Sequence, residues 1–310
     1  MFAKRRYFAL LLLIFVGTVC SACGIKALEK EVEDQLEDGV PLEPVVIVPE
    51  DTTKVELIVK TGKGVDNRCD TWSGQGGAIR DRILYRLYDT GLCQTYDITD
   101  LARPFKIAKF ELGSHMLGNH ANCVQSCVDT VGNVFLYVSG LKGGRAYVEW
   151  VSPMAAMLVQ TITLMPTDVF DGNVGFNIIC GDDGYLWIFG SAGSKLYFGK
   201  ARKPDIQESN VLLTDKDILD HWTVDGYVYH QDVWQGGMVY GGYLYMLFGG
   251  NGTPAHLAIY NVKTHARVKD IDLSSVICEE PEDCELVPEG ILVFTNNGDN
   301  YYLVRPAALN

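Results

Sequence analysis

At 310 residues, with 47% hydrophobic and 11% aromatic residues, the chain can bury a large core, and broad disorder is excluded. Its formal net charge of −13 disfavours nucleic acid as a partner, because phosphate binding needs a basic face. We expect one large domain rather than two.

The first 22 residues predict an export signal. Three basic residues, Lys4 to Arg6, precede an apolar run, Tyr7 to Val19, which is shorter than the ~20 residues of a membrane-spanning helix. The small residues before Cys23 resemble a bacterial lipobox, in which the cysteine is lipidated, although Cys20 stands where Leu is usual. We expect a signal peptide over residues 1–22, lipidation of Cys23 and anchoring to the outer membrane, on its periplasmic face or at the cell surface. An ordinary cleaved signal peptide is the alternative.

An acidic, proline-containing stretch follows over residues 23–53 and predicts a flexible tether. Removal of the signal segment takes away three positive charges and no acid, so the net charge falls from −13 to −16. In Val55 to Lys60 apolar side chains recur at every second position, which predicts a strand. This strand begins the predicted globular domain, residues 54–310.

Beyond residue 70, short β-rich runs alternate with Gly, Asn and Asp turns. Gln75-Gly76-Gly77 recurs 160 residues later as Gln235-Gly236-Gly237, and a Leu-Tyr strand follows each copy. Further units begin near His120, Val174 and Glu285. Their spacings of 45, 54, 61 and 50 residues fit the ~40–50 residues of a four-strand propeller blade.

The predicted fold is therefore all-β, a five-bladed β-propeller. Its third unit has only a weak fourth strand, Asn210 to Leu213, and its fifth unit is one strand short. Val55 to Lys60 can complete that last blade, which closes the ring and removes an exposed edge. Six blades are the alternative if residues 200–232 hide a hairpin, and a β-sandwich is the main rival.

These motifs resemble those of uncharacterised lipid-anchored β-propeller proteins of Gram-negative gut anaerobes. The resemblance rests on the repeated Gln-Gly-Gly, on Asn119 to Asn122 before Phe135 to Ser139, and on Pro288-Glu289-Gly290. It spans roughly residues 70 to 305 and implies the fold and an envelope location, but no activity.

In a propeller, the first strand of each blade lines the central channel. Ligands bind in this channel or at one of its mouths. Alignment of the blade starts places seven polar side chains there: Gln75, His120, Asn122, Asn177, Gln235, Glu285 and Glu289. Such a set suits sugar hydroxyls or a bound ion. The alternative is that these side chains only bond backbone groups between blades.

The cysteines predict neither a metal site nor a cofactor. His115, His120, Cys123 and Cys127 match no common zinc spacing, so we expect no metal. Cys278 and Cys284 bracket a short acidic loop and are candidates for a disulfide in an exported chain.

From these features we expect a non-catalytic binding or scaffold module for a glycan, peptide or envelope protein. The membrane would be reached only through the lipid anchor, and the protein would be a monomer. The alternative is a carbohydrate-active hydrolase or lyase with its site at the channel mouth, using residues such as His120 and Glu285.

Overall fold

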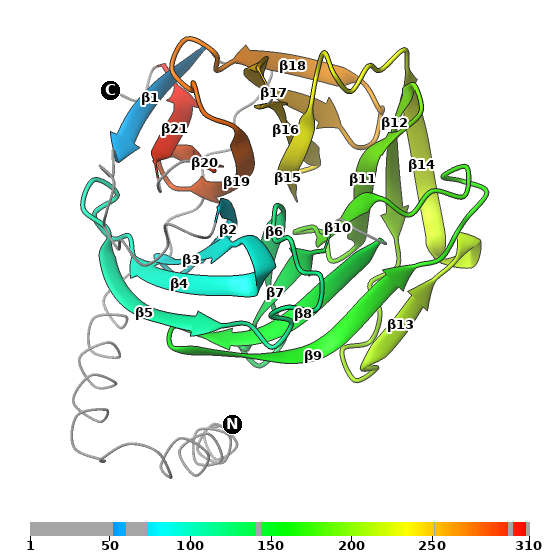
Figure 1. Cartoon of the computed structure of the whole chain (residues 1–310), viewed down its shortest axis with the longest axis horizontal. Coiled ribbons are helices and arrows are strands. Elements are labelled where there is room, and N and C mark those ends of the chain that lie inside the picture. The colour runs from blue at the N-terminus through cyan, green and yellow to red at the C-terminus, as the bar shows by residue number, and fades with distance from the viewer. Residues whose placement is uncertain (1–51, 60–72, 141–143, 251, 297–299, 308–310) are drawn as a thin grey trace. The chain divides into compact units, whose positions relative to one another are not determined.

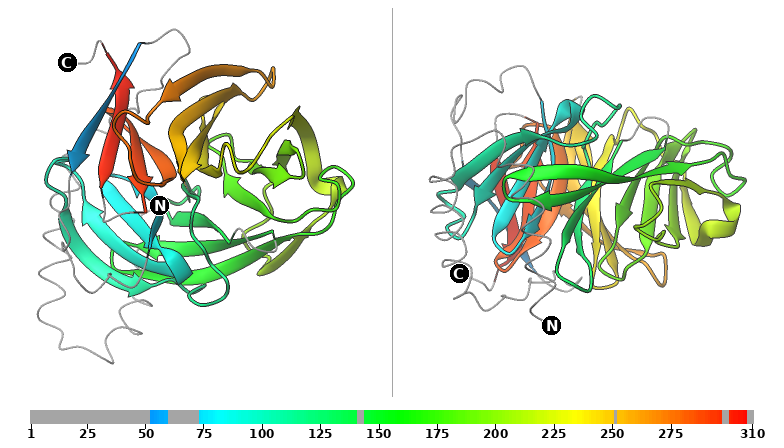
Figure 2. Two further views of the ribbon diagram at one scale, coloured as in Figure 1. Left: turned by 45° about the horizontal axis from the view of Figure 1, so that its top comes forward. Right: turned by 90° about the horizontal axis from the view of Figure 1, so that it is seen from below.

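The computed structural model describes residues 52–59, 73–140, 144–250, 252–296 and 300–307. In these residues five β-sheets surround one axis, and in four of the sheets the chain runs from the axis outward (Figure 1). The same ring of sheets is visible from two other directions in Figure 2. The five-bladed propeller predicted from the sequence is therefore confirmed.

Each of the first four blades contains four strands that pair antiparallel, and they are consecutive in the chain except in blade three, where β13 intervenes. Blade one contains β2 (Gly74–Arg80), β3 (Ile83–Tyr88), β4 (Leu92–Asp97) and β5 (Phe105–Glu111). Blade two contains β6 (Val124–Val128), β7 (Val134–Ser139), β8 (Arg145–Ser152) and β9 (Ala155–Leu164). Blade three contains β10 (Phe176–Cys180), β11 (Leu186–Ala192), β12 (Lys195–Ala201) and β14 (Ile218–Asp225). Blade four contains β15 (Trp234–Tyr240), β16 (Tyr243–Gly250), β17 (Thr253–Asn261) and β18 (Arg267–Asp272).

The fifth blade joins the two ends of the domain. It contains β19 (Pro281–Val287), β20 (Gly290–Thr295), β21 (Tyr301–Pro306) and β1 (Thr53–Val59). The first strand of the domain pairs antiparallel with the last, with Val55 opposite Val304, and the two lie side by side in Figure 1. This is the predicted closure of the ring by an N-terminal strand, and it covers the edge that β21 would otherwise expose.

Residues 200–232 hold no sixth blade. The fourth strand of blade three is β14, and not Asn210 to Leu213 as predicted. Trp222 of β14 stacks on Phe198 of β12, with ring centroids 4.8 Å apart, and this apolar contact explains the pairing. The predicted segment forms β13 (Asn210–Leu213), which pairs in parallel with β9 and adds a fifth strand to blade two.

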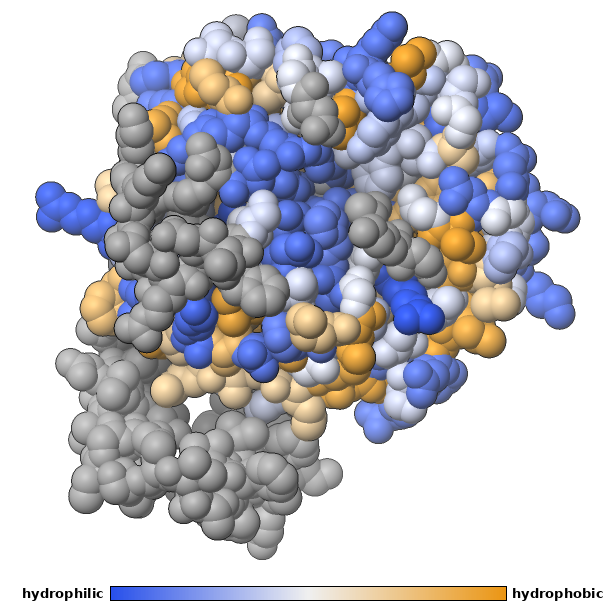
Figure 3. Space-filling model, viewed as in Figure 1, coloured by the Kyte–Doolittle hydropathy of each residue, from blue (hydrophilic) through white to orange (hydrophobic). Residues whose placement is uncertain are grey.

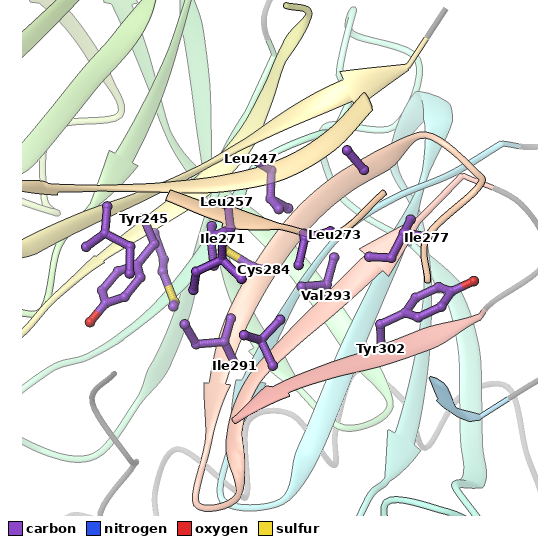
Figure 4. Close-up of a cluster of buried hydrophobic side chains, with 14 of the residues drawn as sticks. Tyr245, Leu247, Leu257, Ile271, Leu273, Ile277, Cys284, Ile291, Val293 and Tyr302 are labelled. Atoms are coloured by element: carbon purple, nitrogen blue, oxygen red, sulfur yellow. The ribbon is translucent and has the colours of Figure 1, made fainter. Parts of the chain in front are cut away.

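Apolar side chains between neighbouring blades form the core. The cluster between blades four and five is drawn in Figure 4, where Leu247, Leu257 and Ile271 face Cys284 and Val293. Each fully buried side chain of this size contributes roughly 1.5–3 kcal/mol. Because every blade packs on two neighbours, the residues at the axis are held from all sides.

The signal segment, Cys23 and most of the tether lie outside the described residues. A helix long and apolar enough to cross a membrane is not found in the part of the chain that the structure describes.

Candidate functional site

The inner strands β2, β6, β10, β15 and β19 begin at one end of the propeller axis and finish at the other. Near their beginnings, the Gly76 N–H donates to the Ala121 carbonyl across 2.6 Å. Beyond their ends, Arg82 pairs with Glu289 of the fifth blade, with 3.1 Å between Nη1 and Oε1. We call the end where these strands begin the upstream mouth and the other end the downstream mouth.

Backbone fills the axis between the two mouths. A Cβ atom on Gly236 would lie 2.3 Å from the Asn122 carbonyl oxygen and 2.4 Å from the Glu282 carbonyl oxygen, so only glycine fits. The buried Asp283 carboxyl group accepts hydrogen bonds from the backbone N–H groups of Val124 (2.9 Å) and Gly77 (3.3 Å). These contacts join blades one, two, four and five, so a ligand would bind at a mouth and not pass through the axis.

Glu282 lies at the upstream mouth in a β-bulge. The pairing register of β19 shifts between Pro281 and Asp283, and the shifts in β2 and β15 fall at their Gln-Gly-Gly segments. A bulge breaks the strict alternation of a strand and redirects a side chain. The fifth blade therefore presents a glutamate at the bulge where blades one and four present a glutamine.

The environment of Glu282 favours the protonated acid. Its side chain is 4% exposed. Burial raises its pKa well above the ordinary value, the negative charges of Glu280 and Asp89 raise it further, and the positive charge of Arg86 opposes them. Glu282 therefore keeps its proton to a higher pH than an ordinary glutamate.

A second carboxylate, Glu280, is held beside it by amide groups. Gln235 Nε2 donates to Glu280 Oε1 across 2.7 Å, and Asn296 Nδ2 donates to Oε2 across 2.8 Å. Glu280 also lines an open groove of about 470 Å³ between blades four and five, together with Glu279 and Asn296. On the face that Figure 3 presents, hydrophilic residues gather over the centre of the propeller.

A carboxylate–imidazole pair from blades one and two completes the polar set. The Asp89 Oδ1 atom lies 3.0 Å from His120 Nδ1 and also accepts the Thr90 N–H across 2.9 Å. Asp89 opens the short 3-10 turn η2 (Asp89–Gly91) at the end of β3, which brings it to the upstream mouth. We call Asp89, His120, Glu280 and Glu282 the upstream carboxylate site.

Arg86 lies beneath this site and is fully buried in β3. Its guanidinium donates to the backbone carbonyl groups of Gln75, Gly76 and Thr295, the last across 2.7 Å. Its carbon Cζ also lies 5.2 Å from the ring centroid of Phe294. The cation thus ties blade one to blade five while it balances part of the acidic charge above it.

Five of the residues proposed from the sequence lie near the upstream mouth. His120 belongs to the upstream carboxylate site, and Gln235 contacts it through Glu280. Among the described residues, buried side-chain atoms of the other three have no hydrogen-bond partner: Gln75 Oε1, Asn122 Oδ1 and Asn177 Nδ2. Asn177 is otherwise bonded through Oδ1 to the Ser139 hydroxyl group across 2.8 Å.

The structure does not bring the other two together with them. Glu285 lies near the downstream end of β19, where burial raises its pKa to about 8 and its Oε1 atom accepts the Leu286 N–H. Glu289 lies in the following turn and pairs with Arg82. The expected combination of His120 and Glu285 in one site is therefore wrong, because the two residues belong to opposite ends of the inner strands.

Sequence reasoning missed Glu282, Glu280 and Asp89 because it began the fifth blade near Glu285. The strand starts four residues earlier, at Pro281, a position that suits proline because a first strand residue needs no ladder N–H. The acidic run Glu279 to Asp283 reads as a solvated turn, yet every residue of β19 is buried. The missing signal was the Gln-Gly-Gly register, which would have aligned Glu282 with Gln75.

The predicted disulfide is not formed in the structure. Cys278 is exposed, Cys284 is buried in the core between blades four and five, and both thiols are free. The reason is the early start of β19, which directs Cys284 into the core.

No family model matches this chain, and no curated protein sequence matches it. Solved structures do match its fold. An exo-β-1,3-galactanase from Clostridium thermocellum is 13% identical with a TM-score of 0.45, over 74% of this chain and 57% of that one. A GH43 β-1,3-galactosidase with galactodeoxynojirimycin is 12% identical with a TM-score of 0.46, over 75% of this chain and 90% of that one. A tail fibre of a Staphylococcus aureus phage is 13% identical with a TM-score of 0.50, over 90% and 55%.

At these identities the likeness shows the fold alone. The expectation of a non-catalytic binding or scaffold module is nevertheless wrong against these comparisons. Several of the neighbours are glycoside hydrolases by name, and this is the class of protein that the alternative drawn from the sequence includes.

Proposed function

We propose that this chain is a carbohydrate-active hydrolase with its active site at the upstream mouth. The observation that supports the proposal is the pair Glu282 and Glu280, two glutamates in opposite environments. Glycoside hydrolysis commonly needs one carboxylic acid that donates a proton to the leaving oxygen and one carboxylate that acts as base or nucleophile. A buried acid with a raised pKa beside a carboxylate held by amide donors meets that need.

In this proposal Glu282 donates the proton and Glu280 supplies the second carboxylate. The Asp89–His120 pair orients the substrate, because the imidazole can exchange hydrogen bonds with sugar hydroxyl groups. Gln235 and Asn296 hold Glu280 in place and are positioning residues.

The test is hydrolysis of a panel of glycosides by the full chain. The panel contains β-1,3-galactan oligosaccharides, arabinoxylan and a set of nitrophenyl glycosides, and released sugar or nitrophenol is measured. We expect turnover of at least one substrate. Glu282→Gln should lower kcat by about 10²-fold or more, because it keeps the shape of the side chain but removes the proton donor.

Glu285→Gln is the matched control, since it removes the ionisable group of another buried glutamate of β19 at the downstream end. It should leave the rate within a few-fold. Circular dichroism must show that both variants are folded. Absence of turnover across the panel, or a folded Glu282→Gln enzyme with unchanged kcat, would overturn the proposal.

We further propose that the domain is exported and tethered to the outer membrane through lipid on Cys23. The basic n-region, the short apolar run and the small residues before Cys23 support this location. Labelling with a radioactive fatty acid tests it. The label should be incorporated into the full chain and lost in Cys23→Ala, and a labelled Cys23→Ala protein would contradict the proposal.

A further inference from the structure

Two cysteines from neighbouring blades meet at the downstream end of the inner strands. Cys127 is the fourth residue of the five-residue strand β6, and Cys180 is the last residue of β10. These strands approach each other beside the axis, as Figure 1 shows, and contact each other directly. The Cys127 Sγ atom lies 4.0 Å from the Cys180 carbonyl oxygen, and the Cys180 thiol group donates to the Gly181 carbonyl oxygen across 3.5 Å.

The two thiols differ in access and in charge. Cys127 is half-buried, whereas Cys180 is fully buried. The neighbouring Cys180 thiol group and the positive charges of Lys203 and Arg80 lower the pKa of Cys127, whereas burial and the negative charge of Glu285 oppose this. Cys127 is thus the thiol that a reagent in solution reaches and that forms a thiolate more readily.

We propose that Cys127 and Cys180 are a redox-active pair that forms a disulfide between blades two and three. The oxidant is a small disulfide such as oxidised glutathione. The Cys127 thiolate attacks one of its sulfur atoms, the S–S bond breaks, and one glutathione leaves as a thiolate. Cys180 then gives up its proton and attacks Cys127 Sγ, which releases the second glutathione. Two protein thiols are oxidised and one glutathione disulfide is reduced.

This pair is independent of the upstream carboxylate site, and the disulfide would act on the stability of the fold. The bond would close a loop of 53 residues that contains strands β7, β8 and β9 of blade two. Of these, β9 also pairs with β13, the fifth strand of that blade. A cross-link of this length stabilises mainly by restricting the unfolded chain. The export proposed above would place the pair in an oxidising compartment.

The test is incubation of the reduced full chain with oxidised glutathione, followed by tryptic digestion without reduction and mass spectrometry. Peptide 110–142, which carries Cys123 and Cys127, should be joined to peptide 146–195, in which Cys180 is the one cysteine. Fragment ions should place the link at Cys127 and not at Cys123. The linked peptide should vanish after reduction, and it should be missing from Cys127→Ser and from Cys180→Ser.

Exposed Cys278 serves as an internal control, because its neighbour in sequence, Cys284, is buried. Cys278 should stay as a mixed disulfide with glutathione while Cys127 proceeds to the cross-link. Oxidation should also raise the thermal midpoint of the wild type by about 5 °C, and this rise should be lost in Cys180→Ser. A folded wild type in which Cys127 carries only glutathione, or in which the link joins other cysteines, would overturn the proposal.

Discussion

Blades one and four share one backbone design but differ in what they bury. In both, a Gln-Gly-Gly segment forms a bulge, and the second glycine lies opposite the same position of the next strand. That position is Arg86 in blade one and Met246 in blade four, and both side chains are fully buried. The glycines recur because the axis leaves no room for a Cβ atom. The positive charge of Arg86, in contrast, is present only in blade one, where it balances the acidic upstream carboxylate site.

This difference separates structural residues from chemical ones. Gln235 in blade four bridges the Gly249 carbonyl and Glu280, whereas the Gln75 Oε1 atom has no hydrogen-bond partner among the described residues. The repeated residues build the ring, and the residues that break the repeat, Arg86 and Glu282, carry the charges.

The largest effect is expected from filling the axis. Gly236→Ala would place a Cβ atom within 2.4 Å of two backbone oxygens, and Gly76→Ala within 2.6 Å of one. Backbone cannot give way as a flexible side chain does, so each variant should lose about 3 kcal/mol or more of unfolding free energy in urea titration. Gly175→Ala, whose Cβ meets only the Asn173 side chain at 3.4 Å, is the control. Equal stability of all three variants would mean that the axis is loosely packed.

The next effect tests the residue that distinguishes the two blades. Arg86→Met gives blade one the residue of blade four and leaves the carbonyl groups of Gln75, Gly76 and Thr295 without their buried donor. We expect a loss of about 3 kcal/mol in chemical denaturation. Met246→Leu in blade four should cost less than about 1.5 kcal/mol, because it conserves volume and removes no hydrogen bond. A harmless Arg86→Met would show that the arginine is not needed for structure.

A smaller effect should separate the two glutamines. Gln235→Ala removes donors from Gly249 and Glu280 and should cost about 1–2 kcal/mol. Gln75→Ala should cost less, since the buried Gln75 oxygen has no partner in the described part of the chain. Thermal unfolding of the two variants side by side measures the difference. The reverse order would contradict the roles given to the two copies.

The smallest effect concerns His256, which stands in blade four where blade one has Leu92. Burial alone would lower the pKa of His256, but hydrogen bonds to Asp232 (2.7 Å) and Asp270 (2.8 Å) raise it above its ordinary value of 6.5. The neighbouring Arg267 also bonds Asp270. A raised pKa in the folded state gives stability that is fully present below the unfolded value, ~6.5, and is lost as the pH rises through the folded value.

The stability difference between the wild type and His256→Leu should therefore be largest below pH ~6.5 and shrink as the pH rises above it. Its size should be about 0.5–1 kcal/mol, as for partly exposed ion pairs. Urea titrations at several pH values measure it. A difference that grows with pH would mean that His256 is held neutral.

The sequence predicted the ring and one member of the site, His120, but not the three carboxylates of the site, for a physical reason. A repeated segment such as Gln235 to Gly237 is visible because the same steric demand returns in each blade. The upstream carboxylate site depends instead on ring closure, which brings Asp89 of blade one beside Glu282 of blade five. Neither residue belongs to a repeated segment, and the bulge that presents Glu282 is set by pairing with β20. No local sequence pattern therefore predicts the site.

The central claim is that the upstream mouth holds a carboxylic acid, Glu282, whose pKa burial raises well above that of an ordinary glutamate. The most direct measurement is difference infrared spectroscopy of the wild type against Glu282→Gln across a pH series. The difference spectrum should contain the carbonyl band of a protonated acid at pH values where an ordinary glutamate, with a pKa of ~4.3, is ionised. Glu285, whose pKa burial raises to about 8, contributes to both proteins and cancels in the difference. A Glu282 that already shows the carboxylate bands at pH 5 would contradict the account.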